Sequence, residues 1–272
     1  MPHVGLGRPG RWKPAQSMTG APELSFVIPC YNESGNLRPL VERIRATARA
    51  AGLAYEIIIT DDCSTDDSWA ILKNLAQEAA DLRAQRFATN LGQSAALWAG
   101  MKAARGRVVV TLDADLQNDP ADLPKFLAQL NAYDCVCGSR VEARRAGDSW
   151  VRVLSSRVAN AVRNWLSGET ITDSGCNFRA IKRACLDDLK FFNGMHRFLP
   201  TLLKIEGYRV TEIPITNQPR LAGQSKYGVW NRLFTSWNDL MAVRWMKKRM
   251  FKPAVAEIAG GGFSPEQKAT LQ

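Results

Sequence analysis

Two aspartates one residue apart could bind a divalent cation. Asp113 and Asp115 follow the apolar stretch 108–112, which predicts a buried strand, and Gln117 lies two residues further on. Carboxylate and amide oxygens are ligands that Mg²⁺ and Mn²⁺ accept, and open α/β folds bind ligands at the carboxyl ends of their strands. The alternative is that both aspartates only shape and cap the following turn, because short Asp-x-Asp patterns also arise by chance.

Strands and helices are predicted to alternate over the first half of the chain. Short apolar runs predict strands, and segments with an apolar residue every three or four positions predict helices. Three consecutive isoleucines at 57–59, within the predicted strand 55–60, indicate burial on both faces, as in a parallel sheet. The predicted strands cover 24–28, 55–60, 83–88, 108–112 and 133–137, and the predicted helices cover 36–51, 66–80, 93–104 and 120–130. This order predicts an α/β fold with a mainly parallel, doubly wound sheet flanked by helices.

The second half of the chain has a different pattern. It predicts helices at 149–166 and 195–205, short strands at 178–181 and 210–215, and a long amphipathic C-terminal helix at 228–250. Tryptophans recur along this last helix at nearly heptad spacing, and basic residues cluster at its end. We expect the helix either to lie in a membrane interface, where such a composition suits anionic lipid, or to pack on the domain or on a partner subunit.

The composition narrows the class of protein. The 272 residues carry a net charge of +10, which favours acidic partners such as a phosphorylated substrate, anionic lipid or nucleic acid. With no C-x-x-C pair and only two histidines, a zinc site is not expected, and reduced thiols in a cytosolic protein are the simplest account of the cysteines. The N-terminal stretch has no apolar signal-peptide segment, and no apolar run approaches the ~20 residues of a spanning helix, so no transmembrane helix is expected.

Two common nucleotide-binding motifs are absent from the sequence. The first predicted strand is followed by PCYNE at 29–33 and not by G-x-G-x-x-G, which counts against a nicotinamide or flavin enzyme, and there is no P-loop. The basic residues also match no known motif for reading nucleic acid. Nucleic acid is therefore not expected as a partner.

Four segments together resemble one enzyme family. They are VIPCYNE at 27–33, TDDCSTDDS at 60–68, LDADLQNDP at 112–120 and CGSR at 137–140. In this order they resemble the inverting nucleotide-sugar glycosyltransferases of family 2, which implies the GT-A fold. Three later segments resemble the polyprenyl-phosphate branch of that family, which includes the dolichyl-phosphate mannose synthases: DSGCNFRAIKR at 173–183, GMHRFLPTLL at 194–203 and NQPRLAGQSKYG at 217–228. The resemblance covers about residues 24 to 250.

The resemblance implies a site for a nucleotide sugar and a metal. The residues implied for the nucleotide sugar are Pro29, Tyr31, Glu33, Asp61, Asp62, Asp113, Ala114, Asp115, Arg140, Arg220 and Lys226. Asp115 and Gln117 are implied as ligands of Mg²⁺ or Mn²⁺, while Asp113 faces the donor. Guanidinium groups match phosphate oxygens in two-point fashion, which suits the arginines. Asp61 could instead cap a turn, and both roles can hold at once.

The resemblance also implies an acceptor that carries a phosphate. The residues implied in catalysis are Asp113, Asp115, Arg140 and Asp173, and those implied for the acceptor phosphate are Arg140, Arg152, Arg157, His196 and Arg197. A phosphate monoester has a second pKa of about 6, so it is already ionised and needs no strong general base. Alternatives stay open: Arg152 and Arg157 could lie on a solvated helix face, Asp173 could form an Asx-turn, and His196 could be structural.

The expected protein is a cytoplasmic enzyme attached peripherally to the inner face of the membrane. It would transfer a sugar from a UDP- or GDP-linked donor to a polyprenyl phosphate for modification of cell-envelope glycan or lipid. The predicted organisation is a flexible arm at 1–22, a GT-A domain at 23–227, the amphipathic helix at 228–252 and a disordered tail at 253–272. A homo-oligomer is left open. The alternatives are a different acceptor, such as a glycan hydroxyl or a lipid head group, and a non-catalytic adaptor for sugar nucleotide and membrane.

Overall fold

The computed structural model describes residues 21–142, 171–218 and 229–250, with side chains of the last segment described from Trp237 on. The strands are β1 (Leu24–Cys30), β2 (Tyr55–Asp61), β3 (Leu82–Arg86), β4 (Val108–Thr111), β5 (Cys135–Ser139), β6 (Arg179–Lys182) and β7 (Val210–Pro214). The helices are α1 (Ser34–Ala50), α2 (Ser68–Glu78), α3 (Gln93–Ala103), α4 (Leu123–Gln129), α7 (Leu199–Ile205) and α8 (Val229–Arg249). Three short 3₁₀ helices complete the described part: η1 (Pro120–Asp122), η2 (Arg183–Leu186) and η3 (Met195–Arg197).

The described strands form one sheet in the order β3-β2-β1-β4-β6-β5-β7. Four of the six strand pairings are parallel, which confirms the predicted mainly parallel sheet. Strand β6 is the exception, because it lies antiparallel between β4 and β5. The carboxyl ends of the other strands and the start of β6 therefore meet at one edge of the sheet.

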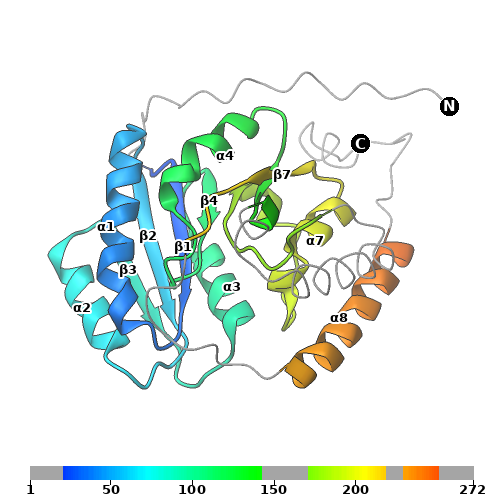
Figure 1. Cartoon of the computed structure of the whole chain (residues 1–272), viewed down its shortest axis with the longest axis horizontal. Helices are drawn as coiled ribbons and strands as arrows, with labels where there is room; N and C mark the ends of the chain where they lie inside the picture. Colours follow the sequence, from blue (N-terminus) through cyan, green and yellow to red (C-terminus); the bar gives the residue numbers. More distant parts are fainter. Residues whose placement is uncertain (1–20, 143–170, 219–228, 251–272) are drawn as a thin grey trace, which may run out of the picture.

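Helices lie on both sides of the sheet (Figure 1). An apolar core lies on each face, because successive strand residues point to opposite faces. Helices α1, α2 and α4 supply leucines and other apolar side chains to the first core, together with Phe26 and Ile28 of β1. Helices α3, α7 and α8 pack on the other face, which receives Val27 of β1 and Ile58 of β2. Helices on both faces are the layering that the alternating sequence pattern predicts.

Helix α8 is amphipathic in the described structure. Leu240 and Val243 are buried in the second core, whereas Trp237 and Trp245 are 49% and 62% exposed. One side of the helix thus packs on the sheet layer, as the packing alternative predicts, and tryptophans lie on the surface. No helix in the described ranges is long and apolar enough to cross a membrane.

Several predicted elements differ in detail or lie outside the described residues. The predicted helix at 120–130 is a 3₁₀ turn followed by α4, and the predicted helix at 195–205 is likewise η3 followed by α7. The predicted helix at 149–166 falls outside the described residues. The predicted arm and tail fall outside them as well, except for residues 21 and 22, and stay predictions.

Candidate functional site

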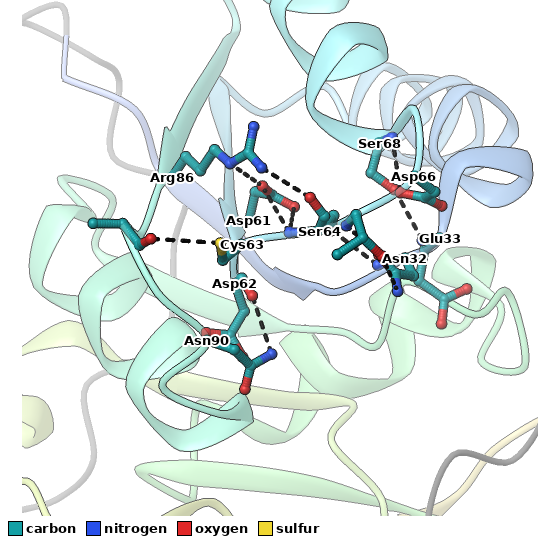
Figure 2. Close-up of polar contacts among 12 residues, drawn as sticks. Asn32, Glu33, Asp61, Asp62, Cys63, Ser64, Asp66, Ser68, Arg86 and Asn90 are labelled. Atoms are coloured by element: carbon teal, nitrogen blue, oxygen red, sulfur yellow. Dashed lines mark hydrogen bonds and ion pairs between the residues drawn. The ribbon is translucent and has the colours of Figure 1, made fainter.

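The turns that follow β1 and β2 are bonded to each other (Figure 2). The Asn32 backbone N–H donates to Ser64 Oγ at 2.8 Å, and Asn32 Oδ1 accepts from the Thr65 N–H at 2.7 Å. The Glu33 N–H donates to Ser68 Oγ at 2.9 Å. Asn32 has a positive φ of 53°, an uncommon conformation that asparagine tolerates better than most residues. These bonds hold the segment after Pro29, including half-buried Tyr31, beside the acidic turn.

The first carboxylate of the acidic turn is fully buried. Asp61 has no exposed surface and lies 3.1 Å from Arg86 Nε, and its oxygens accept from the Ser64 N–H at 3.3 and 3.4 Å. Figure 2 shows the Arg86 and Ser64 contacts on the same carboxylate. The turn-capping role that the sequence left open is therefore present, and the contact to a nucleoside stays a prediction.

The second carboxylate of the turn holds the start of α3. Asp62 accepts from the Leu91 N–H at 2.7 Å and from the Gly92 N–H at 2.8 Å. Burial raises the pKa of Asp62, while these two backbone bonds act in the opposite direction. By holding Leu91 and Gly92, Asp62 places Gln93, the first residue of α3, at the edge of the sheet.

Asp113 lies between side chains from two other segments. Its Oδ1 accepts from Gln93 Nε2 and from Asn177 Nδ2, each at 2.9 Å. Burial raises the pKa of Asp113 and the nearby charge of Asp115 raises it further, while the Asn177 bond and the charge of Arg140 lower it. Two carboxylates that repel each other in a sheltered place would be stabilised by a cation.

The chain turns sharply between Asp115 and Gln117. Leu116 adopts a positive φ of 61°, and Asp115 Oδ1 accepts from the Gln117 N–H at 3.2 Å. Within the described ranges no cluster of three or more His, Cys, Asp and Glu residues could hold a metal alone. A hard cation needs no such cluster here, because Mg²⁺ is commonly bound by one or two carboxylates together with substrate phosphates and water. The oxygen donors of Asp113, Asp115 and Gln117 fit such an ion.

Arg140 and Asp173 form a buried, two-point ion pair. The guanidinium donates from Nε at 2.8 Å and from Nη2 at 3.0 Å, and the Arg140 backbone N–H adds a third bond at 3.1 Å. Both side chains are about 5% exposed. The pair raises the pKa of Arg140 even though burial acts to lower it.

Comparisons with known proteins place this chain among glycosyltransferases. The family model described as "Glycosyl transferase family 2" matches residues 25–190. The chain belongs to this family. Within it, the chain is 34% identical over 245 residues to a dodecaprenyl-phosphate galacturonate synthase of Rhizobium johnstonii, covering 88% of this chain and 70% of that one. It is 32% identical over 243 residues to an undecaprenyl-phosphate 4-deoxy-4-formamido-L-arabinose transferase of Salmonella paratyphi A, covering 89% and 74%.

Solved structures share the fold of this family 2 chain. A glucosyl-3-phosphoglycerate synthase from Mycobacterium tuberculosis in complex with Mn²⁺, UDP and phosphoglyceric acid matches with a TM-score of 0.58, 19% identity and coverage of 86% of this chain and 81% of the other. A mannosyltransferase from Pyrobaculum calidifontis in complex with GDP-Man and Mn²⁺ matches with a TM-score of 0.53, 19% identity and coverage of 81% and 61%. The predicted GT-A fold and the predicted family are confirmed.

The structure brings several predicted residues of this glycosyltransferase together, and others lie outside its described part. His196 Nδ1 is 2.5 Å from Ser94 Oγ, which also accepts from the Gly194 N–H at 2.9 Å. Ser94 directly follows Gln93, which donates to Asp113, so His196 lies near the carboxylate site. The predicted phosphate ligands outside the described residues, which stay predictions, are Arg152, Arg157, Arg220 and Lys226.

Sequence reasoning missed three residues around Asp113. Gln93 and Asn177 bond directly to its carboxylate, and Arg179 bonds to Asn177. Gln93 begins the helix predicted at 93–104, for which no role in the site was predicted. The available signal was Arg179, a charged residue between apolar neighbours in the predicted strand at 178–181. Arginine is rarely fully buried unless it is paired, so this position indicated a specific polar contact.

Proposed function

We propose that this chain is an inverting, metal-dependent glycosyltransferase that moves a sugar from a nucleotide-sugar donor to a polyprenyl phosphate. One observation carries the proposal: Asp113 and Asp115, which follow β4, lie at the same edge of the sheet as the buried guanidinium of Arg140, which follows β5. Asp113 and Arg140 are close enough for their charges to act on each other. Such a site can bind an anionic leaving group through a cation and an anionic acceptor through an arginine. The two relatives described above are named for polyprenyl phosphates, which supports this acceptor.

The donor would bind across the carboxyl ends of β1, β2 and β4. The nucleoside would contact the segment after β1, through Pro29, Tyr31 and Glu33, and the acidic turn after β2. Hydrogen bonds from the Asn32 and Glu33 N–H groups to Ser64 and Ser68 hold these two segments together. Asp115 and Gln117 would hold Mg²⁺ or Mn²⁺, which when bound supplies positive charge to the leaving diphosphate. Asp113 would face the donor sugar or ribose.

The acceptor phosphate would approach the anomeric carbon from the side opposite the diphosphate. A phosphate oxygen forms the new bond as the bond to the nucleoside diphosphate breaks, and the configuration inverts. The nucleophile is already ionised, so no proton must be removed by a base. Asp173 keeps Arg140 oriented, and a preoriented guanidinium can stabilise developing phosphate charge without reorganising. His196, Arg197 and the arginines of the predicted helix at 149–166 are further candidates for the acceptor phosphate.

A donor and acceptor screen tests this function. Thermal unfolding is measured with UDP, GDP and their sugar derivatives, with and without Mn²⁺. Radiolabelled donors that shift the transition are then offered four acceptors in separate reactions: a short polyprenyl phosphate, the unphosphorylated polyprenol, a glycan and a phospholipid. We expect Mn²⁺-dependent stabilisation and label transfer to the phosphate only. Donor binding without any transfer would favour the adaptor alternative, and transfer to a glycan hydroxyl or lipid head group would favour the other acceptor class.

Helix α8 would attach the enzyme to the cytoplasmic face of the membrane. The support is the exposure of Trp237 and Trp245 together with the basic last turn, which contains Lys247 and Lys248. Tryptophan suits the headgroup region and each basic residue near an anionic surface contributes about 1 kcal/mol. We expect the double substitution of both tryptophans by serine, or of both lysines by glutamine, to lower sedimentation with phosphatidylglycerol vesicles at least several-fold.

The charge control for this test lies on the other face of the sheet. Arg38 on α1 and Lys73 on α2 are exposed, so replacing both by glutamine removes the same charge far from α8. This control should sediment like the wild-type protein. Equal pelleting of the α8 variants and the control would contradict the membrane role and leave α8 as a packing helix.

A further inference from the structure

A fully buried arginine lies under the candidate site. Arg179 begins β6 and has no exposed surface, which places it among the largest fully buried side chains of the described structure. Arg179 pairs with Thr111 on β4 and with Cys137 on β5, so its strand is an inner strand of the sheet. Along that strand, Arg179 lies level with the carboxyl end of β4. A charge in such a position is costly unless its N–H groups are bonded.

Within the described ranges, Arg179 has few hydrogen-bond partners, and none of them is a carboxylate. Nη1 donates to Asn177 Oδ1 at 3.1 Å and Nη2 donates to the Ser174 carbonyl at 3.2 Å, while Nε is buried with no partner. Among the described residues, no ion pair within 4.0 Å involves Arg179. A side chain kept for stability alone would be expected to have better satisfied hydrogen bonds.

The bond from Arg179 decides which way the Asn177 amide points. A guanidinium can only donate, so Asn177 must turn its carbonyl oxygen toward Arg179 and its Nδ2 away from it. The Thr111 hydroxyl holds the same residue from the other side by donating to the Asn177 backbone carbonyl. Nδ2 is thereby directed at Asp113 Oδ1, 2.9 Å away.

The orientation of Asp113 depends on this donor. Gln93 Nε2 and Asn177 Nδ2 both bond to Oδ1, and among the described residues none bonds to Oδ2. If the Asn177 amide were reversed, its carbonyl oxygen would face the carboxylate and repel it. The amide orientation therefore selects the carboxylate rotation that leaves Oδ2 for a ligand.

We propose that Arg179 is a positioning residue for the donor site: it fixes the Asn177 amide and so aims the Asp113 carboxylate at the donor. This inference rests on the proposed function, because that function gives Asp113 its role of facing the donor. The hydrogen bonds from Arg179 to Asp113 through Asn177 do not depend on the proposed function. Among the described residues, the hydrogen bonds that connect Arg179 to Asp113 run through Asn177.

A double-mutant cycle tests whether Arg179 acts through Asn177. The changes are Arg179→Met, Asn177→Ala and both together in the full chain, with kcat and KM for the donor measured well below the unfolding temperature. Asn177→Ala removes a hydrogen bond to a charged group, so we expect kcat/KM to fall about 10- to 100-fold. Arg179→Met should lower kcat/KM about 10-fold. The double variant should have the same kcat/KM as Asn177→Ala alone. Full additivity of the two losses would overturn the proposal.

Three further variants separate positioning from simple destabilisation. Arg179→Lys keeps a donor for Asn177 Oδ1 and should recover part of kcat/KM. Ile181→Val, two residues further on the same face of β6, loosens the core but should leave kcat/KM at the wild-type value. Asn177→Leu retains the size of the side chain without a donor, and wild-type kcat/KM in this variant would overturn the proposal even if Arg179→Met does not fold.

The side-chain amide signal of Asn177 in nuclear magnetic resonance gives a readout independent of sugar transfer. In the wild-type protein this amide should be held by Asp113 and protected from exchange, and Arg179→Met should remove the protection while Ile181→Val does not. If the wild-type protein transfers no sugar but the amide responds in this way, the proposed function fails and the positioning role stands. If sugar is transferred and neither the amide nor kcat/KM responds to Arg179→Met beyond Ile181→Val, the positioning role is overturned.

Discussion

Asp115→Asn should lower kcat/KM for sugar transfer by about a thousandfold or more while leaving the fold intact. The substitution removes the charged ligand that we propose for the metal. A bound cation contributes several kcal/mol to stabilising charge on a phosphate leaving group, and each 1.36 kcal/mol is a factor of ten in rate. Asparagine has the same shape and keeps an oxygen that can accept the Gln117 N–H, which Asp115 accepts at 3.2 Å. The measurements are transfer rate against Mn²⁺ concentration and Mn²⁺ affinity in the presence of UDP or GDP.

Asp119→Asn is the matched control for this change. Asp119 Oδ1 accepts from the Ala121 N–H at 3.0 Å at the start of η1, and asparagine caps a helix start about as well as aspartate. This variant loses the same charge four residues away and should keep most of its activity. Wild-type turnover of Asp115→Asn with saturating Mg²⁺ would show that the metal assignment is wrong.

The second large effect is expected at the buried pair of Arg140 and Asp173. Asp173→Asn leaves the guanidinium buried without its counter-charge, and breaking a buried pair in this way costs about 3–5 kcal/mol of unfolding free energy. The double change Arg140→Met with Asp173→Leu replaces the pair by apolar side chains of similar volume and should recover most of that stability. It should not recover sugar transfer, because the cation for phosphate is gone. Thermal unfolding and kcat/KM together check this separation.

A surface pair provides the control for the Arg140 experiment. Arg38 and Glu78 are also joined by two bonds, but their side chains are 50% and 44% exposed. Removing Arg38 should leave the thermal unfolding transition almost unchanged, since exposed pairs contribute little. If the apolar double variant at 140 and 173 regains sugar transfer along with stability, the pair is structural only and Arg140 has no role in catalysis.

Local patterns in the sequence were enough to predict most of the first half of the fold. The consecutive isoleucines of β2 and the periodic apolar residues of α1 were recognised because burial imposes a spacing on neighbouring residues. The same local information placed Asp61 and Asp113 at strand ends, and parallel strands necessarily bring such ends to one edge. The family resemblance added roles that periodicity alone does not contain.

The direction and position of β6 came only from the tertiary structure. A four-residue strand carries no local signal for antiparallel pairing, and its neighbours β4 and β5 precede it by tens of residues. Yet this insertion brings Asn177 within 2.9 Å of Asp113, 64 residues earlier in the chain. Long-range contacts of this kind depend on the order of strands, which local spacing does not specify.

The sequence by itself therefore determined which elements form and which carboxylates stand at their ends, because those properties follow from the spacing of neighbouring residues. Only the tertiary structure decided what each carboxylate contacts. Asp62 bonds to the start of α3, Asp173 bonds to Arg140 across 33 residues, and Asp113 is held from two segments. The physical reason is that a side chain's hydrogen-bond partners are set by the packing of distant segments, and neither their identity nor their geometry is encoded in the local pattern.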